Sequence, residues 1–171
     1  MTPNRTLRSL LTVALLTCGS QALAASTSAS LNVTATVSAN CLISAAPVAF
    51  GAYDPVAAHA TTALDASGAV SVTCTSGSAA TITLGQGTNP NAGSSDASPL
   101  RRMSNGAAGH LSYVLYSDSG RTTAWGNTSL TGVAHTGTGS STALTVYGRI
   151  TSGQNAPTGS YADTVVATVT F

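Results

Sequence analysis

The sequence contains no lysine and no glutamate, and it carries very little charge of either sign. Its permanently charged side chains are six arginines and five aspartates among 171 residues. Proteins that bind nucleic acids or anionic membranes display clusters of basic residues, so this composition excludes recognition of either partner by charge. The low charge does not indicate disorder, because 43% of the sequence is hydrophobic and disordered chains have low hydrophobicity.

Recognisable catalytic and metal-binding motifs are missing as well. The three histidines, His59, His110 and His135, are scattered along the sequence, and there is no Gly-x-Ser-x-Gly elbow or spaced metal-ligand motif. The aspartates occupy turn or strand-end positions, where this residue commonly caps backbone N–H groups. An acid–base pair of aspartates is the enzyme alternative. We expect a protein without catalytic activity, cofactor or metal.

The first 24 residues have the pattern of a secretory signal peptide. Arg5 and Arg8 precede a short apolar run at 10–16, and an Ala-Leu-Ala site ends at Ala24. The run is too short to span a membrane, and we expect cleavage after Ala24. Cys18 follows a threonine rather than the small residue of a lipoprotein site, which disfavours a lipid anchor. The sequence therefore predicts an exported protein.

Residues 28–39 alternate strictly between apolar and hydroxyl or amide side chains, as a β-strand with one buried face does. The apolar positions that we single out are Ala29, Leu31, Val33, Ala35 and Val37. The alternation predicts the conformation and leaves the pairing open. The strand can be the first of its own sheet, or it can pair in a neighbouring molecule.

The remainder, residues 40–171, has many short β-branched segments separated by Gly and Asn turns. Strands are expected at 41–51, 68–75, 81–84, 110–116, 130–133, 142–150 and 161–171. Among the residues expected in the core of the first of these are Leu42 and Ile43. Residues 110–116 are expected to be central and covered on both faces. Strands at this spacing, with no long helix, predict an all-β sandwich.

The last segment alternates up to the final residue. One face carries Val165, Ala167, Val169 and Phe171. The alanine-rich residues 56–66 are expected to form a loop, and 85–109 a long turn-rich passage. Within that passage Arg101-Arg102 is interpreted as a solvated turn or as a salt bridge to an aspartate.

Two cysteines remain after the signal peptide, Cys41 and Cys74. An even pair in an exported chain is most simply a disulfide, and the alternative of a metal or redox pair lacks a Cys-x-x-Cys spacing. The aromatic side chains Trp125, Tyr113, Tyr116 and Tyr147 allow two interpretations. They form either the core of the sandwich or a sugar-binding surface.

Motifs in order along the chain carry a family resemblance. They are Phe50-Gly51-x-Tyr53-Asp54-Pro55, Gly68-x-Val70-x-Val72-x-Cys74, Arg101-x-Met103, Leu111-x-Tyr113-x-Leu115-Tyr116-x-Asp118, Trp125-Gly126, Val146-Tyr147-Gly148-Arg149-Ile150 and Gly159-x-Tyr161-x-Asp163-Thr164-Val165. Together they resemble the spore coat protein U domain, which is shared by subunits of the archaic, Csu-type chaperone-usher pili of Gram-negative bacteria.

The resemblance implies an incomplete immunoglobulin-like sandwich at 40–171, with Cys41 and Cys74 bridged. Residues 25–39 would supply the missing last strand to a neighbouring subunit, and Val165 to Phe171 would border the groove that accepts it. Implied partners are a periplasmic chaperone, an outer-membrane usher and identical or related subunits in a homopolymer on the cell surface, serving attachment and biofilm formation. The alternatives are a secreted spore or cyst coat protein and a monomeric carbohydrate- or surface-binding sandwich.

Overall fold

The computed structural model describes residues 23–171. The expected signal peptide lies almost entirely outside these residues. One compact unit spans Thr36–Phe171, and the residues before it belong to a separate unit. Among the described residues there is no helix with the length and apolar character that crossing a membrane requires.

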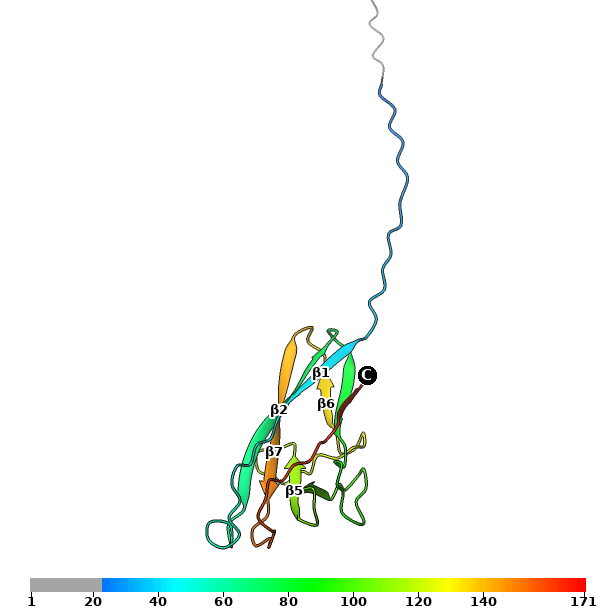
Figure 1. The fold of residues 1–171 in the computed structure, drawn as a ribbon. Coiled ribbons are helices and arrows are strands. Elements are labelled where there is room, and N and C mark those ends of the chain that lie inside the picture. Colours follow the sequence, from blue (N-terminus) through cyan, green and yellow to red (C-terminus); the bar gives the residue numbers. More distant parts are fainter. Residues whose placement is uncertain (1–22) are drawn as a thin grey trace, which may run out of the picture. The chain divides into compact units, whose positions relative to one another are not determined.

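Five antiparallel strands form the larger sheet (Figure 1). In spatial order they are β1 (Cys41–Ala46), β2 (Leu64–Cys74), β7 (Ser141–Ile150), β5 (His110–Tyr116) and β4 (Arg101–Ser104). The long central pair β2 and β7 runs from Leu64 opposite Ile150 to Thr73 opposite Ser141. β1 is an edge strand, because β2 is its only strand partner within this sheet of the described chain.

The smaller sheet has the order β6 (Val133–Thr136), β3 (Ala79–Leu84) and β8 (Ala167–Thr170). The inward-facing residues of the two sheets form one core. Its buried members are Val70, Val72, Ile82, Leu84, Leu111, Tyr113, Leu115, Trp125, Val146 and Ile150. The predicted all-β sandwich is therefore confirmed.

Alternation determines which face of each strand is buried. In β7 the even-numbered residues Val146, Gly148 and Ile150 are buried and the odd-numbered ones are more exposed. Val48 and Phe50 lie over Gly148 and leave no room for a side chain at this position. A Cβ at Gly148 would come within 2.7 Å of both side chains.

Several expected boundaries differ from the observed ones. The expected strand at 130–133 is wrong: Thr128 accepts backbone hydrogen bonds from Thr131 and Gly132, which makes a turn, and β6 begins only at Val133. β5 is central, but its outer face is not covered, since Ser112 is exposed. Leu42 faces outward and is 68% exposed, so it is not a core residue.

The two ends of the described chain depart furthest from the sequence-based strands. Residues 28–39 have no strand partner in the described structure, and Leu31, Val33 and Val37 are 82–86% exposed. The last strand is limited to Ala167–Thr170, which pairs with β3. Before it, only an isolated bridge between Ala162 and Ser104 interrupts the irregular segment 161–166.

Candidate functional site

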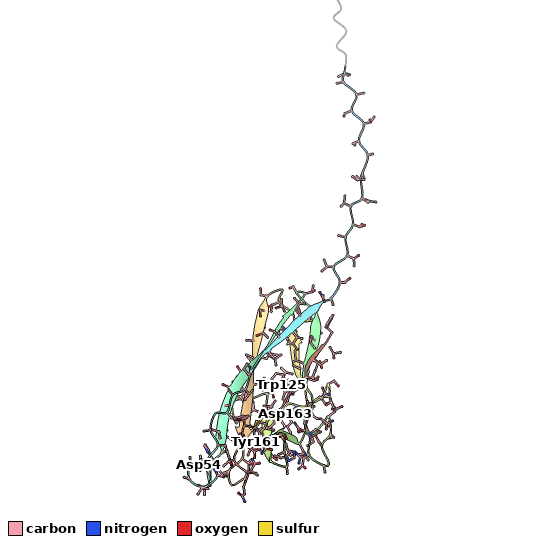
Figure 2. The ribbon with its side chains drawn as sticks, in the orientation of Figure 1. Asp54, Trp125, Tyr161 and Asp163 are labelled. Carbon is pink, nitrogen blue, oxygen red and sulfur yellow. A yellow bond between two sulfur atoms is a disulfide. The ribbon has the colours of Figure 1, made fainter. Side chains whose placement is uncertain are left out.

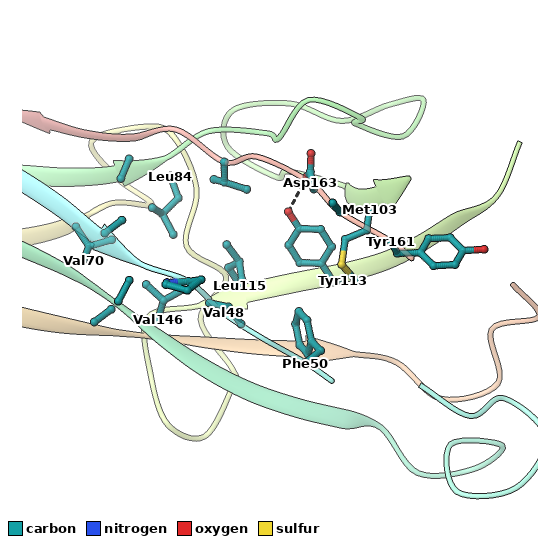
Figure 3. A pocket seen from close by; sticks show the side chains of 17 residues that line it. Val48, Phe50, Val70, Leu84, Met103, Tyr113, Leu115, Val146, Tyr161 and Asp163 are labelled. Atoms are coloured by element: carbon teal, nitrogen blue, oxygen red, sulfur yellow. Dashed lines mark hydrogen bonds between the residues drawn. The ribbon is translucent and has the colours of Figure 1, made fainter. Parts of the chain in front are cut away.

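An open apolar groove of about 480 Å³ runs between β1 and the C-terminal segment (Figure 3). Its walls are the end of β1 and residues 161–167, and its floor is the inner face of the larger sheet. The lining residues are Ala45, Ala46, Pro47, Val48, Phe50, Ala69, Val70, Leu84, Met103, Tyr113, Leu115, Val146, Tyr161, Ala162, Asp163, Val165 and Ala167. The groove thus leaves apolar side chains that pack against the core, among them Val48, Phe50 and Val165, partly accessible at one side of the sandwich.

Both walls of the groove lie at sheet edges, the second because the irregular residues 161–166 lead directly into β8. β1 ends the larger sheet and β8 ends the smaller one. In the described structure, the backbone groups of residues 163–165 form no hydrogen bonds with the backbone of another segment, although their neighbours Ala162 and Val166 do. Unpaired edges beside accessible apolar side chains are the arrangement that accepts an added strand.

A disulfide between Cys41 and Cys74 attaches the first wall to the sheet. The two cysteines are directly opposite each other in the pairing of β1 with β2. At the far end of β1, Gly68 allows the chain to turn inward. A Cβ there would come within 2.7 Å of the carbonyl oxygen of Pro47. Val48 and Phe50 then enter the groove, where Phe50 packs edge-on against Tyr113 with ring centroids 6.1 Å apart.

The carboxylate of Asp163 joins the second wall to β5 of the larger sheet and to the loop that follows β3. It accepts hydrogen bonds from the backbone N–H of Thr88 (2.8 Å), from the Thr88 hydroxyl (2.6 Å) and from the Tyr113 hydroxyl (2.6 Å). The backbone N–H of Thr164 also donates to it, at 2.9 Å. Burial acts to raise the pKa of Asp163, but these hydrogen bonds outweigh it and lower the pKa below the ordinary value.

Arg101 lies beneath this wall and is 1% exposed. It donates to the backbone carbonyls of Leu84, Gly85 and Trp125 at 2.7–2.8 Å. Burial lowers its pKa to about 10, so the guanidinium remains charged at neutral pH. The expectation of a solvated turn or salt bridge at Arg101-Arg102 is wrong for Arg101, which belongs to β4 and links the two sheets through carbonyl oxygens.

The predicted groove residues are only partly brought together. Val165 and Ala167 line the groove. Val169 is partly buried against the core further along β8, and Phe171 is 54% exposed beyond its end. The five apolar residues singled out in 28–39 are exposed, and none of them belongs to a strand of the described structure.

Sequence reasoning missed the structural roles of Asp163 and Arg101. Both carry a detectable signal, because each has the parity of buried residues: Asp163 matches Val165 and Ala167, and Arg101 matches Met103. A charged residue on the buried face of a strand needs hydrogen-bond partners inside the fold. By contrast, Asp54 caps a turn as expected, accepting from the N–H groups of Val56 and Ala57.

Two of the four candidate sugar-binding aromatics belong to the core. Trp125, labelled in Figure 2, is fully buried. It donates its indole N–H to the carbonyl of Ile82 at 2.9 Å. Tyr113 is also buried. Tyr116 and Tyr147 are paired on the outer face, where Arg121 lies 5.6 Å from the Tyr147 ring. Residues 23–171 contain no cluster of three side chains suited to a metal ion.

Comparison with known proteins gives the groove a context. The Spore Coat Protein U domain matches residues 27–168 of this chain. The chain belongs to this family. It is also 48% identical over 159 residues to Protein U of Myxococcus xanthus, with 89% of each chain covered.

A solved structure has the same fold. A chain in the CsuC–CsuE chaperone–tip adhesion subunit pre-assembly complex, from the archaic chaperone-usher Csu pili of Acinetobacter baumannii, aligns with a TM-score of 0.56. The alignment covers 80% of this chain and 40% of that one, at 21% sequence identity. At this low sequence identity, the similarity shows a shared sandwich fold and nothing more specific.

Proposed function

We propose that this protein is a structural subunit of a chaperone-usher pilus, and that residues 28–39 of one copy fill the groove of the next. The observation that carries the proposal is the groove between two unpaired sheet edges, β1 and the C-terminal segment. The same chain carries an exposed segment with the alternation that such a groove requires. Each copy therefore offers both an acceptor and a donor.

The residues next to β1 favour an intermolecular donor. Asn40 continues the pairing of β1, since its carbonyl accepts from the N–H of Thr75 at 2.9 Å and its N–H donates to the Thr75 hydroxyl. The Thr75 hydroxyl also contacts the carbonyl of Ser38. To reach its own groove beside β1, the segment must reverse direction before residue 38. Residues 28–40 contain no glycine or proline that would favour such a turn.

Burial of the donor supplies a large driving force. Leu31, Val33 and Val37 are almost fully exposed, and burying each contributes roughly 1.5–3 kcal/mol. With smaller terms from the alanines, the strand contributes on the order of 5–10 kcal/mol before ordering costs. Backbone pairing along both walls adds to this. Assembly of this kind is nearly irreversible.

The remaining partners follow from the open groove. A subunit with exposed core is prone to aggregate before assembly, so it needs a chaperone that covers the groove and an usher that exchanges chaperone for subunit. We assign residues 1–24 as the export signal, 25–39 as the donor extension and 40–171 as the pilin domain. The assembled fibre lies on the cell surface and serves attachment and biofilm formation.

A second candidate is a structural protein of a secreted spore or cyst coat. It is favoured by the family description and by the 48% identity with Protein U. Both candidates describe structural proteins without catalysis. They differ in the product, which is a linear fibre for the pilin and a cell-enclosing layer for the coat protein.

Deletion of residues 28–39 tests the proposal. Full-length and deleted chains are each expressed with the chaperone and usher of the source cell, and unheated samples are run in SDS. The full-length chain is expected to give a ladder that collapses on heating, while the deleted chain still binds chaperone and gives no ladder. Long fibres from the deleted chain would refute the donor role, and an assembled layer without fibres from the full-length chain would favour the coat.

A further inference from the structure

We infer that Asp163 is the positioning residue of the acceptor groove: its carboxylate holds residues 163–165 in a course that leaves their backbone groups, apart from the Thr164 N–H that it binds itself, free to pair with a donor strand. This inference rests on the proposed function. It assigns a specific role to a side chain that lines the groove and binds both the larger sheet and the loop that follows β3.

The segment before β8 is attached by few backbone contacts. At one end, Ala162 pairs with Ser104 through hydrogen bonds of 2.9 and 3.0 Å. At the other end, the N–H of Gly85 donates to the carbonyl of Val166 at 2.9 Å. Between these points, the described structure provides attachment to other segments mainly through the side chains of Asp163 and Val165. Without such attachment, an apolar segment beside an open groove would lose its extended course.

Two segments that are remote from Asp163 in sequence converge on its carboxylate. Thr88 belongs to the loop that follows β3, and its N–H and hydroxyl both donate to Oδ1 at 2.8 and 2.6 Å. Tyr113 belongs to β5 and donates to Oδ2 at 2.6 Å. The Asn89 amide reaches Oδ1 at the outer limit of 3.5 Å. The carboxylate therefore fixes the wall to the loop that follows β3 on one side and to the larger sheet on the other.

The loop is shaped around this carboxylate. Gly87 has a φ of +83°, which favours glycine, and a Cβ at this position would overlap Oδ2 of Asp163. The side chain of Thr88 is aimed at the same group. Asp163 therefore has more hydrogen-bond donors around it than an aspartate that only caps a turn needs. Asp54, for comparison, accepts from two local N–H groups and does not connect separate parts of the sandwich.

The role predicts a specific effect on donor binding. When the wall is held in advance, a donor strand does not need to order residues 163–165 as it binds, and pre-ordering of this kind increases affinity. Loss of the carboxylate should therefore increase the dissociation rate of the donor by about tenfold or more. Asparagine keeps an acceptor oxygen for Thr88 and an amide that can donate to the Tyr113 oxygen, so it should restore most of the affinity.

Binding of a synthetic peptide provides the test. The acceptor is the full chain carrying Ala35→Arg, which disables its own donor, and the probe is a fluorescent peptide of residues 28–39 followed by anisotropy. Asp163→Ala is compared with Asp163→Asn, and Asp65→Ala is the control, because Asp65 forms ion pairs on the outer face. Fluorescence of the buried Trp125 reports whether each variant is folded.

The outcomes separate the inference from the proposed function. Faster release from Asp163→Ala, recovery with Asp163→Asn and no change with Asp65→Ala support the positioning role. Equal release from folded Asp163→Ala and its parent would refute that role while leaving donor-strand assembly intact. Failure of the peptide to bind the parent would instead refute the proposed function. If Asp163→Ala does not fold, Tyr113→Phe and Thr88→Val each remove one hydrogen bond to the Asp163 carboxylate, and release about threefold faster is expected from each. Unchanged release from both would overturn the role.

Discussion

Arg101 donates a hydrogen bond of 2.8 Å to the backbone carbonyl of Trp125, so a buried charge in the larger sheet holds the loop that carries the largest core side chain. The same guanidinium binds the carbonyls of Leu84 and Gly85, where β3 ends. These three acceptors lie inside the sandwich. Arg101 is thus a structural cross-link between the two sheets.

Replacement of Arg101 by methionine should destabilise the domain by about 3–5 kcal/mol, because three carbonyls lose their donor. Arg102→Met is the matched control on the same strand, since Arg102 donates hydrogen bonds to the carbonyls of Asn89 and Pro90 in the adjacent loop. Its expected loss is about 1 kcal/mol or less. Urea denaturation monitored by Trp125 fluorescence measures both. Equal losses would contradict the cross-linking role.

The disulfide should contribute about 3–4 kcal/mol, as expected for closing a loop with a sequence separation of 33 residues. The variant with both Cys41→Ala and Cys74→Ala should therefore melt at a markedly lower temperature than the oxidised chain. Calorimetry with and without a reductant measures the difference, and the reductant should not change the alanine variant. Equal melting temperatures for oxidised chain and variant would show that β1 needs no covalent attachment.

Stability should decrease in acid because of Asp65 and Asp163. The hydrogen bond from Arg149 lowers the pKa of Asp65, and the donors around Asp163 lower its pKa despite burial. A carboxylate whose pKa is lowered by folding stabilises the fold above the unfolded pKa near 4, and this contribution is lost as pH falls toward the folded pKa. Unfolding curves between pH 7 and pH 2 should show this decrease. Asp163→Asn should flatten it, and an unchanged slope would contradict the assignment.

Gly148→Ala should disturb the floor of the groove, because the added Cβ would lie 2.7 Å from Val48 and Phe50. Overpacking of this kind costs about 1–3 kcal/mol. Thr145→Ala, at an exposed position of the same strand, is the control and should cost less. Thermal melts measure the loss of stability. If Gly148→Ala were as stable as the control, the packing of Phe50 over the sheet would be in doubt.

The alternating segments made much of this fold predictable. β2, β5 and β7 bury the residues that period-two spacing assigned to their inner faces, and Cys74 ends β2 on that face. The pattern was less informative at 85–109 and 130–133. There, the hydrogen bonds that the Thr128 carbonyl accepts and the buried side chain of Arg101 determine the course of the chain. The turn at Thr128 has no periodic signature, and the parity of Arg101 does not specify the carbonyls that it binds.

The groove was harder to derive than the strands that border it. Alternation assigns Val165 and Ala167 to one face without specifying what covers them. Only the three-dimensional order of the sheets places the edge β1 beside the C-terminal segment. Asp163 shares the parity of these residues, and the importance of its carboxylate depends on Thr88 and Tyr113, which are remote in sequence.

A complementation experiment tests the central claim most directly. One full-length variant carries Ala35→Arg in the donor segment. The other carries Ala45→Arg, at an exposed position that lines the groove, so it keeps its donor and loses its acceptor. Each variant alone should remain unassembled, because a charged side chain cannot be buried in an apolar groove without a partner.

Mixing the two variants should give a one-to-one heterodimer that resists SDS until heated, and nothing longer, with mass measured by light scattering. Wild-type chain under the same conditions should form a ladder. Fibres from Ala35→Arg alone, or no heterodimer on mixing, would contradict the claim that residues 28–39 of one copy complete the sandwich of the next.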